Sequence, residues 1–207
     1  AIVPSARERI DEVLATYGVV SEFRGGTRIT SEEAIPFIKM AAFDVSNRVM
    51  TMLSANGITA VIGNWVRARG IGVIDGVDYR SAGVVESVRA DTLRTLMEGG
   101  VVPIFPCIGW SSVGKPYNIS SNELAVVVAT TLGAGKLFFI TASPAYAAAS
   151  YRVPDTVPVT PEGRLANFGL AALDGFFALT PGREAALELL HRARRACASG
   201  TPSRRAW

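Results

Sequence analysis

Residues 99–141 constrain the fold of this chain most strongly, because they have the pattern of a strand, a polar loop, a helix and a second strand. The run 101–105 is short, apolar and rich in β-branched residues, which is typical of a strand covered on both faces. When the strands of such a unit are parallel, the loop lies at the carboxyl edge of the sheet, where open α/β sheets bind small molecules. We therefore expect a ligand site within residues 109–122.

The remaining sequence predicts further helices and strands around this unit. Apolar spacing and capping residues indicate helices over residues 7–17, 30–55, 91–97, 120–132 and 182–199. Short apolar runs indicate strands over residues 1–4, 19–23, 59–63, 101–105 and 137–141. Glycine-punctuated β segments over 65–88 predict a hairpin layer, and the glycines of 24–30 predict a loop that can approach a ligand closely. We expect an α/β fold, a three-layer α/β/α sandwich with a mostly parallel central sheet.

Length and composition suit one globular domain with a full core, since the 207 residues are 49% hydrophobic and 19% charged. We expect this domain over residues 1–200 and a tail over 201–207. Residues 1–4 have the pattern of the last residues of a strand, so we expect the domain to be truncated at its N-terminus.

Charge and cysteine content argue against several partners. The net charge of +3 comes from 21 basic and 18 acidic residues spread along the chain without a recognition motif, so we expect no nucleic-acid partner. No apolar run of about 18 residues and no secretory pattern is present, so we expect no membrane partner. Cys107 and Cys197 are too few for a disulfide framework and lack metal-ligand spacing, so we expect a cytoplasmic protein without a metal site.

Several blocks in a fixed order carry a resemblance to a known family. They are Gly63-Asn64-Trp65 and residues 72–79 and 109–123, with supporting blocks at 3–7, 10–11 and 26–30. In these blocks the chain resembles the amino-acid kinase domain of bacterial N-acetylglutamate synthase. The resemblance covers residues 1–141, and the expected helix at 183–200 is similar to the last helix of that domain. It implies the amino-acid kinase fold.

The resemblance implies a protein of two parts. The amino-acid kinase domain binds L-arginine as a feedback inhibitor and forms homo-oligomers. An acetyltransferase domain then transfers an acetyl group from acetyl-CoA to L-glutamate, the first step of arginine biosynthesis. We expect that second domain to lie outside this chain, so the implied effector is L-arginine and no cofactor is expected here. Whether this chain alone is an enzyme stays open.

Phosphoryl transfer on this fold needs lysines, glycine N–H groups and an organising carboxylate around the phosphate. In the related N-acetylglutamate kinase, the resemblance implies a Lys-x-Gly-Gly strand end, a Gly-Gly-Gly loop and an Asn-x-x-x-Asp pair. Here the first segment is absent, the glycine loop corresponds to Pro4-Ser5-Ala6, and the pair becomes Asn118 and Asn122. Lys136 is the last lysine of the chain. We therefore expect no catalytic residues.

Four residues remain candidates for contacts with a bound amino acid: Arg28, Gly109, Asn118 and Asn122. An arginine fork can grip a carboxylate, and an asparagine amide can donate and accept hydrogen bonds. Two of them have a structural alternative, because Arg28 can form a surface salt bridge and Asn118 can be a turn residue before a helix.

Three functions stay open from the sequence. The chain can be the arginine-sensing, kinase-inactive domain of an N-acetylglutamate synthase, an active N-acetylglutamate kinase, or a stand-alone oligomerisation module without a ligand. The missing carboxylate and lysines favour the first.

Overall fold

The computed structural model describes residues 1–24, 26–140, 153–155 and 157–163. The chain divides into two units, Ala1–Gly135 and Lys136–Trp207. The helix expected over 182–199 and the tail over 201–207 lie outside the described residues. None of the described helices is long and apolar enough to cross a membrane.

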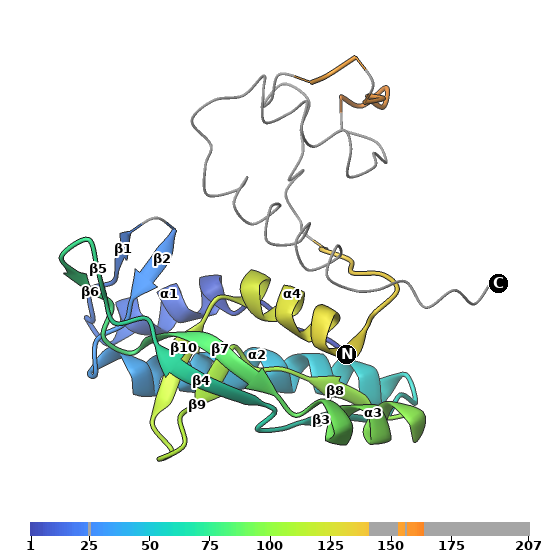
Figure 1. The fold of residues 1–207 in the computed structure, drawn as a ribbon, viewed down its shortest axis with the longest axis horizontal. Helices are drawn as coiled ribbons and strands as arrows, with labels where there is room; N and C mark the ends of the chain where they lie inside the picture. The colour runs from blue at the N-terminus through green and yellow to red at the C-terminus, as the bar shows by residue number, and fades with distance from the viewer. Residues whose placement is uncertain (25, 141–152, 156, 164–207) are drawn as a thin grey trace. The chain divides into compact units, whose positions relative to one another are not determined.

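The first unit combines helices with short strands (Figure 1). Its helices are α1 (Arg7–Thr16), α2 (Ala34–Ala55), α3 (Ala90–Glu98) and α4 (Ser121–Leu132). Its strands are β1 (Glu22–Arg24), β2 (Thr27–Ile29), β3 (Ala60–Ile62), β4 (Val66–Gly70), β5 (Val73–Ile74), β6 (Val77–Asp78), β7 (Ala82–Val88), β8 (Val102–Ile104), β9 (Ile108–Trp110) and β10 (Pro116–Ile119). All the helices predicted for this unit form. The second helix begins at Ala34, where the Ala34 N–H donates to Ser31 Oγ at 3.1 Å.

Strand β8 lies in a small parallel sheet. It pairs in parallel with β3, and Ile2 bridges in parallel to Ile104 at the end of β8. Ile2 N donates to Pro103 O at 2.9 Å, and Phe105 N donates to Ile2 O at 2.9 Å. Helix α3 packs on β8, and α2 packs on β3. The chain thus has the mixed α/β fold with parallel strands that its sequence predicts, while the three-layer order and the truncation stay predictions.

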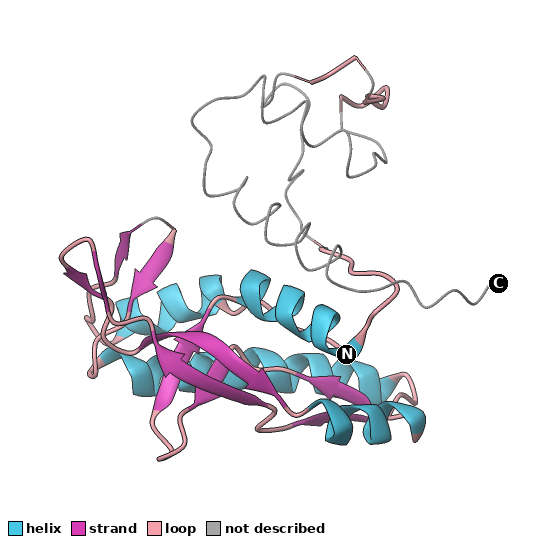
Figure 2. Ribbon diagram, in the orientation of Figure 1, coloured by secondary structure: helices cyan, strands magenta, loops and turns pink. Residues whose placement is uncertain are grey.

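Four further strands close into a barrel in the order β10, β7, β4, β9. Strands β9 and β10 pair antiparallel, with Tyr117 opposite Gly109, and β10 joins β7 in parallel, with Asn118 opposite Ala82. Figure 2 shows α2 behind these strands, and α2 contacts β10. The polar loop expected between the strand at 101–105 and the helix at 120–132 is therefore wrong, because this stretch contains β9 and β10. The aromatic and β-branched residues of this stretch suit a pleated, half-buried surface better than a loop.

Two antiparallel hairpins, β1–β2 and β5–β6, lie at one end of the unit (Figure 1). The loop expected over residues 24–30 is wrong, because Thr27–Ile29 pairs with Glu22–Arg24 and Phe23 lies opposite Arg28. Gly26 in the turn has φ +78°, a conformation that costs little only for glycine.

The strand expected over residues 137–141 is wrong over its described residues, since Leu137 to Ile140 form neither strand nor helix. These four residues are exposed, and no described strand pairs with them. An apolar run becomes a strand only where a neighbour supplies its hydrogen bonds.

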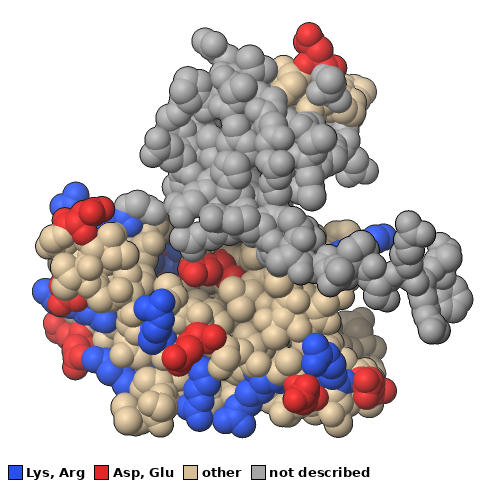
Figure 3. All heavy atoms as spheres, viewed as in Figure 1, with Lys and Arg blue, Asp and Glu red and all other residues tan. Residues whose placement is uncertain are grey.

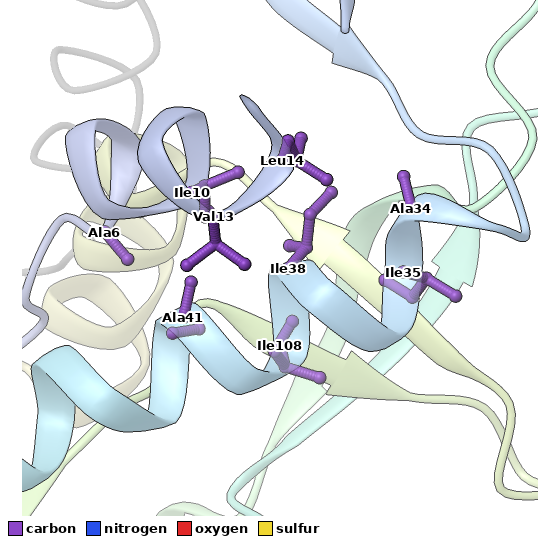
Figure 4. Packing of buried hydrophobic residues seen from close by; sticks show 10 residues of the cluster. Ala6, Ile10, Val13, Leu14, Ala34, Ile35, Ile38, Ala41 and Ile108 are labelled. Carbon is purple, nitrogen blue, oxygen red and sulfur yellow. The ribbon is translucent and has the colours of Figure 1, made fainter. Parts of the chain in front are cut away.

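The core of the first unit has two clusters of apolar side chains. In the first, α1 packs on α2 and Ile108 of β9 closes the cluster (Figure 4). Ile10 and Leu14 on α1 and Ile38 on α2 have the helical spacing that predicted them to be buried, and they are 5%, 2% and 0% exposed. The second cluster fills the space among the barrel, α3 and α4, and its buried members are Val66, Ala68, Leu93, Phe105, Cys107, Ile119, Leu124 and Val128.

Cys107 is expected to be inert towards thiol reagents in the folded chain. Its thiol lies in the second cluster, where Sγ donates to Pro4 O at 3.3 Å. Burial raises the pKa of this thiol from 9.0 to about 12. Because only the thiolate reacts, a Cys197→Ser variant should react with a maleimide roughly a hundredfold more slowly when folded than when unfolded in urea. Equal rates in the two states would contradict this burial.

Candidate functional site

Arg28 lies on β2 with its side chain buried against α1. Its Nη2 donates to Asp11 Oδ1 at 2.6 Å, and its Nη1 donates to Ser21 Oγ. The guanidinium carbon lies 4.5 Å from the centre of the Phe23 ring, a cation–π distance. The sequence left open that Arg28 forms a surface salt bridge. It does form a salt bridge, with Asp11, but it is not a surface residue, because it is only 6% exposed.

Asn118 lies on β10, within a barrel strand. Its Nδ2 donates to Thr30 Oγ1 at 3.1 Å, and Thr30 Oγ1 donates to the Arg28 carbonyl at 3.3 Å. The Asn118 side chain and the Arg28 backbone carbonyl are thus connected through one buried hydroxyl, whereas the Arg28 guanidinium bonds Asp11 and Ser21. The alternative that Asn118 is a turn residue before the helix is wrong, because it pairs with β7 and β9.

Ser81 completes this polar group. Its N–H donates to Thr30 O at 2.8 Å, and its carbonyl accepts from Asn118 N at 2.9 Å. The Ser81 side chain is fully buried, and its Oγ has no hydrogen-bond partner within the part of the chain that the structure describes. A buried hydroxyl without a partner is unfavourable by about 1–3 kcal/mol. Thr30, Ser81 and Asn118 thus form a buried polar group in which one hydroxyl is left without a partner among the described residues.

The other two predicted residues have different surroundings. Gly109 faces the packed interior of the barrel, where an added Cβ would lie 2.4 Å from Ala68 Cβ and 2.5 Å from Ile119 Cδ1. Asn122 lies in the first turn of α4 and is exposed. Gly109 has no side chain, and the Asn122 side chain makes no hydrogen bond to Arg28 or Asn118 among the described residues. Contact of either residue with a ligand stays a prediction.

The first unit also has a cavity of about 630 Å³, and some of its lining residues are sequence neighbours of Thr30 and Ser81. The cavity is lined by Ser31, Glu32, Glu33, Asp78, Arg80 and Lys115. Lys115 Nζ lies 2.6 Å from Glu32 Oε1, and the hydrogen bond between them lowers the pKa of Glu32 and raises that of Lys115. Ser31 directly follows Thr30, and Arg80 directly precedes Ser81. Thr30 and Arg80 form a parallel bridge. The cavity is therefore lined by residues adjacent in the chain to those of the buried polar group.

Charges of both signs are interspersed over the visible face of the described residues (Figure 3). This face carries no extended patch of one sign. Among the described residues, no three His, Cys, Asp or Glu side chains gather where they could hold a metal ion.

Sequence reasoning did not identify Asp11, Thr30 or Ser81 as members of the site. Asp11 stands 17 residues before Arg28, and no local pattern links the two. For Thr30 and Ser81, the only available signal was their position beside predicted strands. Polar residues next to strand ends often line ligand-binding sites.

The fold is that of a known class. The family model described as "Amino acid kinase family" matches residues 1–146, so this chain belongs to the amino acid kinase family. Within that family, it is similar to the amino-acid acetyltransferase of Ralstonia nicotianae, at 29% identity over 152 residues, covering 69% of this chain and 34% of that protein. It is also similar to the acetylglutamate kinase of Geobacillus kaustophilus, at 32% identity, covering 69% of this chain and 57% of the kinase.

Solved structures agree with this family assignment. N-acetylglutamate synthase from Neisseria gonorrhoeae, complexed with coenzyme A and N-acetyl-glutamate, matches with a TM-score of 0.75 and 27% identity, covering 94% of this chain and 43% of that one. The same enzyme complexed with coenzyme A and L-arginine matches with a TM-score of 0.74 and 27% identity, covering 95% and 45%. The resemblance predicted from the sequence is confirmed. The chain spans about a third of the curated acetyltransferase (34%) and little more than half of the curated kinase (57%).

Proposed function

We propose that this chain is the arginine-binding, kinase-inactive amino acid kinase domain of an N-acetylglutamate synthase, in which a transferase part outside this chain acetylates glutamate. The observation that carries the proposal is the likeness to a synthase solved with L-arginine, which covers 95% of this chain. In the transferase part, the α-amino group of glutamate would attack the thioester of acetyl-CoA.

The chemistry at the start of α1 supports a kinase-inactive domain. Pro4-Ser5-Ala6 precedes this helix, and proline has no N–H to donate to a phosphate. The Pro4 carbonyl accepts a hydrogen bond from Cys107, and the Ala6 side chain is buried at 5% exposure. Pro4 and Ala6 thus serve the core, which leaves few groups for a phosphate cradle. Asn122 stands where an organising carboxylate would be needed.

The polar group around Thr30 supports amino-acid binding. Arg28 can hold a carboxylate, and Ser81 and Asn118 offer hydrogen bonds to an ammonium or carboxylate group. L-arginine would regulate by binding one assembly state of a homo-oligomer more tightly than another, with a coupling of about 1–3 kcal/mol. We propose that Gly109 and Asn122 border the same ligand.

A second candidate is an active acetylglutamate kinase, which is favoured by the 32% identity to the Geobacillus kaustophilus enzyme. That activity would require ATP and magnesium. This chain would have to hold the transferring phosphate without the lysines, the glycine loop and the organising carboxylate of such a kinase. A stand-alone oligomerisation module is the third candidate, and it would bind neither ligand.

A thermal-shift titration of the full chain separates the three candidates. Saturating L-arginine at about 100 times its Kd should stabilise the fold by about 2.7 kcal/mol. This corresponds to a rise in Tm of roughly 5–10 °C for a chain of this size. D-arginine serves as the control, and no rise is expected with ATP and magnesium. Turnover of ATP with N-acetylglutamate would instead establish the kinase, and no response to any ligand would favour the module.

A further inference from the structure

Helix α2 leaves a long face exposed to solvent. Its other side packs on α1 and on Ile108 of β9 (Figure 4). The exposed positions of this helix carry Pro36, Met40, Asn47, Arg48, Thr51, Met52, Ser54 and Ala55. Arg48 is the one charged residue among them. A helix face that stays in water is normally rich in charge, whereas the centre of a protein–protein interface is poor in charge and enriched in methionine and arginine. This face of α2 therefore has the composition of an interface.

Four side chains of this face form one row. Met40, Asp44, Arg48 and Met52 are spaced four residues apart, so they follow one another along the helix over about 18 Å. Met40 is 48% exposed and Met52 is 66% exposed. The side chains of Asp44 and Arg48 are 36% and 63% exposed. Read in the opposite direction, the row places methionine opposite methionine and each charge opposite its counter-charge. The row is therefore complementary to an antiparallel copy of itself.

A second copy of α2 can lie on this row about a two-fold axis that passes midway between Asp44 and Arg48. Each Asp44 then lies beside Arg48 of the second copy, and each Met40 lies beside Met52 of the second copy. A two-fold axis repeats every contact, so the pair gains two ion pairs and two methionine contacts. Rows of this kind align when two helices cross at about −50°, the commonest crossing of packed helices.

The charged residues at the centre have hydrogen-bonding atoms to spare. Asp44 Oδ2 accepts from Arg9 Nε at 2.8 Å and from Arg48 Nη2 at 2.9 Å. Asp44 Oδ1 accepts no hydrogen bond among the described residues, and Arg48 donates there only through Nη2. An arginine from a second copy can therefore bond Oδ1 without displacing either partner that Asp44 has in its own chain.

Apolar side chains extend the face beyond both ends of the row. Near the start of α2, the Tyr17 ring stacks on Phe37 at 4.5 Å, and Tyr17 is 57% exposed. Just after the end of α2, Ile58 is 40% exposed. In an antiparallel pair the start of one helix lies beside the end of the other. The aromatic pair of one copy therefore approaches Ile58 of the second copy.

We propose that this face of α2 is the surface on which two copies of the chain associate, with their α2 helices antiparallel and Asp44 paired with Arg48 of the second copy. The inference rests on the homo-oligomer of the proposed function, for which it names the contact surface and its register. It holds whether or not the chain binds arginine.

The test measures the mass of the full chain by light scattering during size-exclusion chromatography. At micromolar concentration the unmodified chain should have twice its monomer mass of 21.9 kDa. Arg48→Asp places two carboxylates at both central contacts, and Asp44→Arg places two guanidinium groups there. Each variant alone should be a monomer, because like charges at both contacts should weaken association at least a hundredfold, equivalent to about 2.7 kcal/mol.

The two variants should rescue each other when they are mixed. In a mixed pair, both acidic positions of one copy face both basic positions of the other. An equimolar mixture should therefore form a heterodimer, which is captured through a tag on one of the two copies. Rescue requires residues 44 and 48 to meet across the two-fold axis, because damage to the fold of either variant would not be repaired by mixing.

A matched control inverts a charge on a different helix. Arg94→Asp on α3 removes an arginine that pairs with Asp91 at 3.2 Å, and it should leave the dimer mass unchanged. Far-UV circular dichroism checks the fold of every variant.

A second pair of variants applies if Asp44→Arg does not fold, since that change removes the contact with Arg9. One copy then carries Met40→Lys with Met52→Lys, and the other carries Met40→Glu with Met52→Glu. Each should again be a monomer alone and a heterodimer in the mixture.

The outcomes distinguish the inference from the function on which it rests. An unmodified chain that stays monomeric overturns the inference, and so does an assembly that both single variants leave intact. Folded variants whose mixture stays monomeric overturn it as well. A rise in Tm with L-arginine in any of these cases leaves arginine binding intact. A rescued heterodimer without any response to arginine supports the inference and contradicts arginine sensing.

Discussion

Replacing Phe105 with alanine should lower the free energy of unfolding by about 3–5 kcal/mol, the range for large aromatic side chains in cores. Phe105 is 0% exposed and lies among Leu93, Leu124 and Val128 of the second cluster. Its truncation removes apolar burial and leaves a cavity that the barrel and helices cannot close completely. Urea unfolding followed by far-UV circular dichroism measures the change.

Two further variants make this measurement specific. Phe105→Leu keeps most of the volume and should cost less than about 1.5 kcal/mol. Val20→Ala changes a side chain that is 84% exposed, and it should change stability by less than about 0.5 kcal/mol. If Phe105→Ala were no more destabilising than Val20→Ala, Phe105 would not lie in the core.

Replacing Gly109 with alanine should destabilise the fold by about 1–3 kcal/mol in the absence of any ligand, because the barrel has no room for a methyl group. The new Cβ would lie 2.4 Å from Ala68 Cβ, which is attached directly to the backbone of β4 and cannot rotate away. Ile119 Cδ1, at 2.5 Å, is the end of a flexible side chain and can move. The backbones of β4 and β9 would have to separate.

The double variant Gly109→Ala with Ala68→Gly tests this cause. It removes the rigid clash, so it should recover about 1 kcal/mol or more relative to the sum of the two single changes. Additive effects would show that Ala68 is not the obstacle. Titration with L-arginine would then show separately whether Gly109 also borders a ligand, since a purely structural glycine leaves the affinity unchanged.

Local patterns predicted the helices and the parallel strands well. Ile10, Leu14 and Ile38 have helical spacing, and a single helical face must be buried whatever its partner is. The apolar runs that became β3 and β8 were recognisable for a different reason. A strand covered on both faces needs no polar residues.

The barrel and the candidate site were less predictable. Glycines around Gly109 suggested a ligand loop, but in the structure Gly109 allows two barrel strands to pack closely. Arg28 and Asn118 were recognised as polar candidates, yet their connection through Thr30 and the pairing of Arg28 with Asp11 depend on strand register.

The sequence by itself determined the α/β class, the positions of the helices in the first unit and the resemblance to amino acid kinases, because these depend on periodicity and on ordered local motifs. Only the tertiary structure decided which side chain neutralises Arg28, why Gly109 must lack a side chain and where Ser81 lies. These contacts join segments far apart in the chain, and their distances follow from how strands and helices pack rather than from any local preference.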